Sequence, residues 1–176
     1  MRKLALALLV LAVSAAPASA AQPPTKQVIT QTPTLTNATA CGTYGVTWRI
    51  NLTATIWTFR DDLGRRTKTI TYVEEDNTVE NTVTGLTLRD GPVNFVDTTT
   101  FDPETGLREQ IVIVGTSVNV RRGRERLLDT GLVVIDGQTL KITFSLGPHP
   151  LRELLSDAGS LNPALALPGF CRILRP

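Results

Sequence analysis

The chain has 176 residues, of which 41% are hydrophobic and 19% are charged, and its formal net charge is +2 at pH 7. This length and composition suit one globular domain and exclude a fibrous or wholly disordered chain. Because so small a net charge gives no long-range steering towards nucleic acid, we predict no nucleic-acid partner.

The first twenty residues have the three-part pattern of a secretory signal peptide. Arg2 and Lys3 precede the apolar run from Leu4 to Val13, and the small residues Ala18-Ser19-Ala20 follow. Because such small residues precede a cleavage site, we predict cleavage near Ala20 and a secreted protein. The apolar run is shorter than the about 20 residues that cross a bilayer, so we predict no membrane span. Cleavage leaves 16 basic and 16 acidic residues.

Residues 21–40 are rich in Thr, Gln and Pro, and Lys26 is their only charged residue. A polar segment with so few bulky residues is typical of an extended, flexible leader. The predicted organisation is therefore a signal peptide over 1–20, a flexible leader over 21–40 and a single β domain over 41–176.

From residue 46 onward, apolar and polar residues alternate with the period of a β-strand. The clearest case is the run from Val46 to Ile56, and we interpret residues 74–77 as a turn or a charged edge. Further strands are predicted over 65–73, 79–83, 93–101, 107–120, 124–136 and 140–146. Because short turns separate them, we predict an all-β, antiparallel up-and-down β-barrel, with a β-sandwich as the alternative.

A short C-terminal helix is predicted to begin at Pro150, a residue that suits the first helical position. Leu151, Leu154 and Leu155 would share one face, and Gly159 would end the helix. We expect this helix to pack over one barrel mouth or against the outer wall.

The two cysteines, Cys41 and Cys171, bracket nearly the whole predicted domain. Outside the cytosol such a pair usually forms a disulfide, so we predict a Cys41–Cys171 bridge. On the chain-entropy account, closing so long a loop stabilises the fold by about 4–5 kcal/mol at most.

Six short motifs lie between residues 41 and 171: Cys41-Gly42, Asp61-Asp62-Leu63-Gly64, Asn81-Thr82-Val83-Thr84-Gly85, Arg126 to Gly131, Gly147 to Leu151, and Cys171. Together they resemble a group of secreted actinobacterial proteins with no assigned activity. The resemblance implies a secreted bacterial β domain with end-to-end cysteines, and it implies no substrate and no catalytic residues. The chain departs from that group at Thr43, where its members usually carry Phe or another apolar residue.

His149 is the only histidine, and with Glu153 it offers too few ligands for zinc. No serine lies in a Gly-x-Ser-x-Gly pattern, and no acidic run matches a calcium loop. We therefore interpret His149 as a loop residue. We predict no catalytic residue, cofactor or metal ligand, which favours a protein that is not an enzyme.

Two sets of residues are candidate contact surfaces. Trp57 and Phe59 fall on the polar side of the first strand, where they would form an exposed aromatic pair. The favoured interpretation is that a bulge after Ile56 or the C-terminal helix hides them. Arg121, Arg122 and Arg124 would bind phosphate, acidic glycan or lipid head groups, or else form a solvated hairpin turn, which is favoured.

Three functional hypotheses follow from the predicted barrel. The first is a non-enzymatic protein that binds a small apolar ligand or acts in the cell envelope. The second is an isomerase-like or cyclase-like enzyme with its site in the barrel mouth, and the third is a protein-interaction module. Inward polar residues at one barrel mouth would favour the enzyme. An empty apolar cavity would favour the ligand-binding protein, and a core filled by side chains would favour the interaction module.

Overall fold

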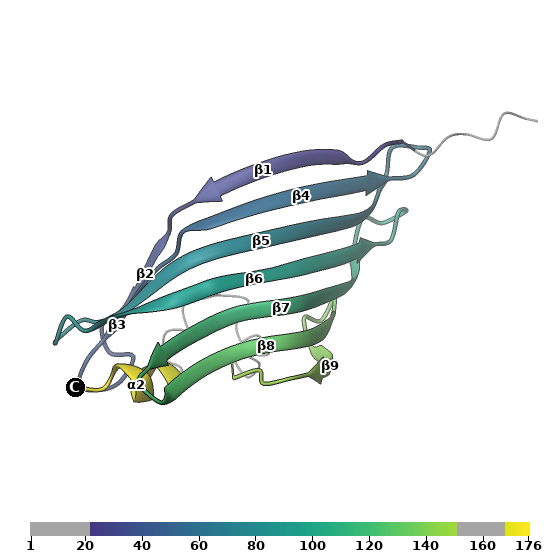
Figure 1. Cartoon of the computed structure of the whole chain (residues 1–176). Coiled ribbons are helices and arrows are strands. Elements are labelled where there is room, and N and C mark those ends of the chain that lie inside the picture. Colours follow the sequence, from purple (N-terminus) through teal and green to yellow (C-terminus); the bar gives the residue numbers. More distant parts are fainter. Residues whose placement is uncertain (1–21, 151–167) are drawn as a thin grey trace, which may run out of the picture.

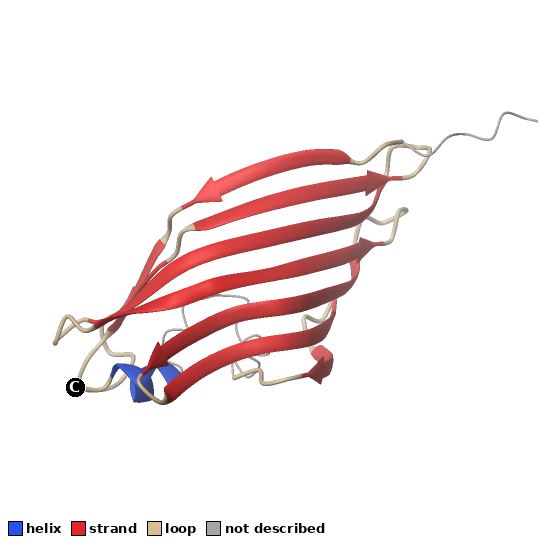
Figure 2. Cartoon of the chain, in the orientation of Figure 1, coloured by secondary structure: helices blue, strands red, loops and turns tan. Residues whose placement is uncertain are grey.

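The computed structural model describes residues 22–150 and 168–176, and its strands belong to one antiparallel sheet (Figure 1, Figure 2). The strands are β1 (Thr25–Gln31), β2 (Thr34–Asn37), β3 (Val46–Arg49), β4 (Leu52–Arg60), β5 (Arg66–Asn81), β6 (Thr87–Phe101), β7 (Arg108–Arg122), β8 (Glu125–Asp136) and β9 (Ile142–Leu146). Helix α2 (Pro168–Leu174) follows near the C-terminus. The predicted signal peptide and residues 151–159 of the predicted helix lie outside the described residues.

The sheet order is β1-β4-β5-β6-β7-β8-β9, with β2 paired to β3 and β3 paired to β5. The predicted antiparallel, mostly up-and-down order is therefore confirmed. The predicted barrel is wrong, because β1 and β9 form the two edges of an open sheet. The β-sandwich is wrong as well, because the nine described strands form one sheet rather than two.

Strands β1 and β2 lie within the segment predicted as a flexible leader. Strand β1 pairs with β4 from Thr25 opposite Thr58 to Gln31 opposite Leu52, and β2 pairs with β3. The segment is polar because it forms an edge whose side chains are mostly exposed. Leu35 is an exception, since it packs against the hydrophobic core.

Two segments that the sequence analysis left outside the predicted strands are irregularities inside long strands. Strand β5 continues through Glu74-Glu75-Asp76-Asn77, and the register shifts between Glu75 and Asn77. Strand β6 continues through Asp90-Gly91-Pro92 on the other side of the same irregularity. Turn-forming residues in both strands thus lie opposite one another and are accommodated as a bulge.

Helix α2 packs against one face of the sheet, which we call the inner face. Phe170, Ile173 and Leu174 of the helix have no exposed surface. They share a core cluster with Tyr44, Val46, Trp48, Ile50, Val79, Val118, Val120 and Leu127. Along the sheet, these residues extend from β3 and the segments that flank it, through β5, to β7 and β8. Because one short helix contacts strands so far apart, the sheet must curl around it at this end (Figure 1).

The predicted disulfide is confirmed: Cys41 and Cys171 are bonded across a sequence separation of 130. Polar contacts fasten the same helix. Tyr44 Oη donates to the carbonyl of Cys171, and Asn81 Nδ2 donates to the carbonyl of Leu174 at 2.9 Å. The C-terminal segment is therefore tied to β5 and to the segment that leads into β3.

We predict that replacing both cysteines, Cys41→Ser and Cys171→Ser, lowers the free energy of unfolding by up to about 4–5 kcal/mol, because the unfolded chain regains the entropy of a long open loop. The check is urea unfolding of both proteins followed by far-ultraviolet circular dichroism. The native β spectrum should persist in the variant, and an unchanged unfolding midpoint would contradict the prediction.

Candidate functional site

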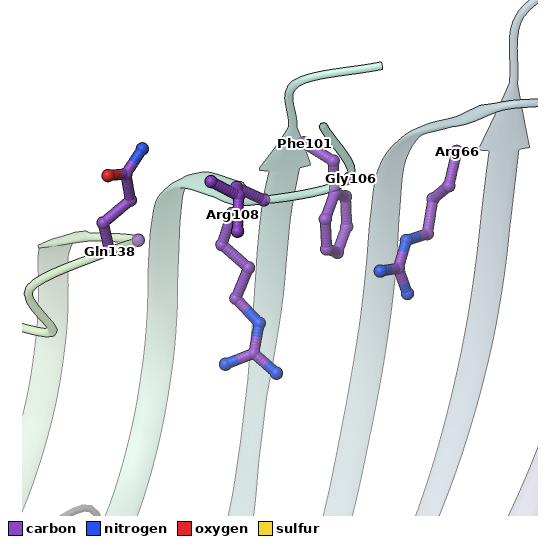
Figure 3. Close-up of a pocket in the computed structure, with 7 residues that line it drawn as sticks. Arg66, Phe101, Gly106, Arg108 and Gln138 are labelled. Carbon is purple, nitrogen blue, oxygen red and sulfur yellow. The ribbon is translucent and has the colours of Figure 1, made fainter. Parts of the chain in front are cut away.

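A pocket of about 390 Å³ lies at the end of the inner face opposite α2. Strand ends and turns line it, through residues Arg66, Phe101, Gly106, Leu107, Arg108, Gly137 and Gln138 (Figure 3). The register places Phe101 directly opposite Arg108 across β6 and β7, so these two side chains share one face of the sheet. The pocket therefore combines residues brought together by strand pairing.

Two guanidinium groups dominate the chemistry of this pocket. Arg66 stacks on Phe101, with its Cζ 3.7 Å from the ring centroid. Arg108 lies on the other side of the ring, and both arginines extend in the same direction along the strands (Figure 3). Within the described part of the chain, neither guanidinium makes a salt bridge. Their hydrogen-bond donors are therefore available to an anion.

Asp97 of β6 is an acidic residue on the inner face that interacts electrostatically with Arg108. Burial raises the pKa of its carboxyl, while a hydrogen bond from Thr99 Oγ1 at 2.9 Å and the charge of Arg108 act in the opposite direction. The positive charge of Arg108 thus reaches a half-buried acid deeper on the inner face.

A second polar group lies nearer to α2 and centres on Asp90, which is fully buried. Its Oδ1 accepts a hydrogen bond from the backbone N–H of Asn119 at 2.7 Å. Burial raises the pKa of Asp90, and burial together with the charge of Asp90 raises the pKa of Glu75. Asn77 Nδ2 donates to Glu75 Oε2 at 2.6 Å and so opposes the rise at Glu75.

Two buried atoms in this group have no hydrogen-bond partner among the described residues, Asp90 Oδ2 and Trp48 Nε1. The indole N–H nevertheless helps to lower the pKa of Asp90, so it lies near the carboxyl without reaching hydrogen-bond geometry. Because Trp48 also packs on Phe170 of α2, with ring centroids 5.6 Å apart, this acidic group lies within the packed end of the sheet.

His149 lies in the loop after β9, as predicted, and both nitrogens of its ring have polar contacts. Nδ1 is 3.3 Å from Asp129 Oδ1, and Nε2 is 3.0 Å from the carbonyl oxygen of Leu146. Ser117 Oγ donates to the same Asp129 oxygen at 2.6 Å. A hydrolytic triad needs the serine on the histidine ring, whereas here the serine contacts the aspartate. The arrangement therefore links β7, β8 and the loop rather than activating Ser117.

Trp57 and Phe59 lie on the outer face, as their parity predicts. The register of β4 with β5 is regular up to Phe59, so the bulge considered after Ile56 does not form. Helix α2 packs on the inner face and does not cover them, and the helix predicted from Pro150, which was the other way of hiding them, lies outside the described residues. Lysines cover them in part: Lys26 Nζ lies 5.8 Å from the Trp57 ring centroid, and Lys68 Nζ lies 4.5 Å from that of Phe59.

The arginines of the β7–β8 hairpin lie at the α2 end, far along the strands from the pocket. Arg122 donates to the carbonyls of Ile173 and Arg175, so it fastens the end of the chain. Arg121 and Arg124 are exposed and make no side-chain hydrogen bond or ion pair with a described residue. The three residues thus stay together in one hairpin but differ in their contacts: Arg122 is engaged by backbone carbonyls, and Arg121 and Arg124 face solvent.

Sequence reasoning missed Arg66 and Arg108. Each begins a strand after a turn, at Asp61-Asp62-Leu63-Gly64 and at Asp102 to Gly106. An arginine beside a turn is ordinary, and no local signal indicates that the two positions meet around Phe101.

Within residues 22–150 and 168–176, no three His, Cys, Asp or Glu side chains come together as a metal site. Among the same residues, no helix has the length and apolar character needed to cross a membrane.

Comparisons of the chain with protein-family models, with curated proteins and with solved structures found no match. The class is therefore defined by the fold: an all-β protein with one open antiparallel sheet and a disulfide-linked C-terminal helix. The resemblance to secreted actinobacterial proteins stays a prediction.

We predict that Glu75→Gln raises stability at neutral pH and flattens its pH dependence. The raised pKa of Glu75 means that the folded state holds a proton which the unfolded state releases near the ordinary value of 4.5. Stability from this group is therefore complete below that value and is lost as the pH rises through the folded-state pKa. Urea unfolding midpoints measured between acidic and neutral pH check this.

Glu104→Gln is the matched control, because Glu104 is an exposed turn residue. Its profile should follow that of the unaltered protein. If Glu75→Gln destabilised the protein equally at every pH, the burial of Glu75 would not control its ionisation, and the prediction would be wrong.

Proposed function

We propose that this chain is an exported, non-enzymatic protein that binds a small ligand bearing an anionic group. The ligand's oxyanion would bind between Arg66 and Arg108, and its apolar part would pack on Phe101 and Leu107. Arginine suits this task because its planar fork of N–H donors matches a carboxylate, phosphate or sulfate. A pocket of about 390 Å³ is the size of a small-molecule site.

The observation that carries the proposal is the placement of two guanidinium groups beside one buried aromatic ring. Like charges repel one another, and neither arginine forms a salt bridge with a described carboxylate, although Asp97 acts electrostatically on Arg108 from deeper on the inner face. A bound oxyanion would place negative charge directly beside both guanidinium groups. Leu107 is 53% exposed at the pocket wall, so it offers apolar surface to the rest of the ligand.

Export is supported by the predicted signal peptide and by the Cys41–Cys171 disulfide, since such bonds persist in oxidising compartments. Binding is better supported than the isomerase or cyclase hypothesis. Asp90 is buried in the packed end of the sheet, and both ring nitrogens of His149 are already engaged. Neither group is placed to contact a ligand in the pocket.

Isothermal titration with naphthalene-2-carboxylate tests the proposal, with naphthalene-2-methanol as the neutral counterpart. We expect saturable binding of the carboxylate and at least about 10-fold weaker binding of the alcohol, because a hydrogen bond to a charged group contributes about 1.5–3 kcal/mol. Arg66→Gln/Arg108→Gln should bind the carboxylate as weakly as the unaltered protein binds the alcohol.

The matched control is Lys26→Gln/Lys141→Gln, which removes two exposed positive charges from the same end of the sheet without altering the pocket wall. It should keep the affinity of the unaltered protein. Equal losses in the two double variants would show that general charge, rather than the pocket, attracts the ligand. Equal affinity for the carboxylate and the alcohol would show that the arginines do not recognise the anionic group, which would contradict the proposal.

A further inference from the structure

Six arginines gather at the end of the sheet that α2 covers. The β7–β8 hairpin supplies Arg121, Arg122, Arg124 and Arg126, and the C-terminal segment supplies Arg172 and Arg175. The two segments are in direct contact, because Arg122 Nη1 donates to the carbonyl of Ile173 at 3.2 Å and Arg172 Nη2 donates to that of Arg126 at 3.4 Å (Figure 1). We call these six residues the arginine cluster.

The negative charge within the same two segments is small. It consists of Glu125, which pairs with Arg175 at 2.7 Å. The chain beyond the predicted cleavage site carries 16 basic and 16 acidic residues. The excess of positive charge at this end is therefore a local asymmetry in a chain that is balanced as a whole.

Part of the arginine cluster has a structural role. Arg122 is half-buried and bonds two carbonyls, Arg175 pairs with Glu125, and Arg126 Nε donates to Asn119 Oδ1 at 3.1 Å. Four of the six are exposed and lack a carboxylate partner among the described residues: Arg121, Arg124, Arg126 and Arg172. Their remaining N–H donors face solvent.

We propose that the arginine cluster is a docking surface for a flexible, linear polyanion, a polymer whose phosphate or carboxylate groups repeat along its chain. The exposed arginines come from two separate segments, three from the β7–β8 hairpin and one from helix α2. This arrangement suits several oxyanions in succession better than a single small anion. The surface is at the opposite end of the sheet from the ligand pocket, so it is independent of the proposed function.

A soluble polymer fits this surface better than a membrane. Peripheral proteins bind bilayers most firmly when apolar side chains insert beside the cations. The hairpin tip consists of Gly123 and Arg124, which provide no such side chain. One exposed apolar residue, Val83, lies in the β5–β6 turn at this end, and a single valine offers little apolar surface for insertion. The exposed apolar residues Val114 and Leu146 flank Leu132, which lies six positions along β8 from Arg126, a distance of about 20 Å.

Binding of long-chain inorganic polyphosphate and of polygalacturonate, measured by isothermal titration, tests the proposal. With four ion contacts, affinity should fall about 50-fold between about 50 and about 200 mM salt, because counterion release gives a slope of roughly −0.7 per contact for a single-stranded polyanion. Arg121→Gln/Arg124→Gln should bind more weakly at low salt, and its affinity should fall only about 7-fold over the same range.

The matched control, Lys26→Gln/Lys141→Gln, loses the same charge at the other end of the sheet and should bind like the unaltered protein. Arg121 and Arg124 make no described side-chain contact, so thermal unfolding of their variant should be unchanged, and Arg172→Gln provides a second, independent variant. Preference for one polymer over the other identifies the oxyanion, and either preference supports the proposal.

Three results would overturn the proposal. One is equal loss of affinity in the cluster and control variants, which would mean that only overall charge matters. Another is unchanged polymer binding in both cluster variants. The third is tighter binding to vesicles containing phosphatidylglycerol than to either polymer, since the partner would then be a lipid surface.

Discussion

The structure depends on the packing of α2 against the inner face of the sheet. Phe170, Ile173 and Leu174 are fully buried between residues of β3 on one side and of β7 and β8 on the other. Without this helix, one face of an open sheet would expose its apolar side chains to water, at a cost of roughly 25 cal/mol for each Å². The Cys41–Cys171 disulfide and the carbonyl contacts of Asn81 and Arg122 hold the helix in place.

This packing gives the two ends of the inner face different chemistry. Near α2 the space is filled, so Asp90 and Glu75 lie in surroundings that favour their neutral forms. At the other end, strand ends and turns leave a pocket, and Arg66 and Arg108 keep their charges near solvent. Burial therefore separates acids that serve the packed core from cations that remain available for binding.

Local sequence signals predicted the core strands and the disulfide, but they missed the polar edge strands β1 and β2 within the predicted leader. Alternation from Val46 to Ile56 correctly assigned Trp48 to the core, and the cysteine pair predicted the bridge. Parity placed Trp57 on the opposite face, as observed, although a bulge or the C-terminal helix was favoured to hide it. Whether the sheet closes into a barrel could not be predicted, because the pairing of its first and last strands depends on the geometry of the whole sheet. The acidic run from Glu74 to Asn77 was interpreted as a turn or edge because a bulge and a turn share the same residue types. Arg66 and Arg108 meet only through strand pairing, which no local pattern contains.

Arginine rather than lysine occupies both candidate binding surfaces, and this choice matters for a chain whose formal net charge is only +2. So small a net charge attracts an anion only weakly from a distance, since long-range steering requires an extended field. Recognition must then arise at contact, where the planar guanidinium offers directed pairs of hydrogen bonds that an ammonium group does not. The lysines Lys26 and Lys68 instead cover aromatic rings on the outer face. Both kinds of cation contact aromatic rings, since Arg66 stacks on Phe101, but arginine alone adds paired, directional hydrogen-bond donors at the two candidate surfaces.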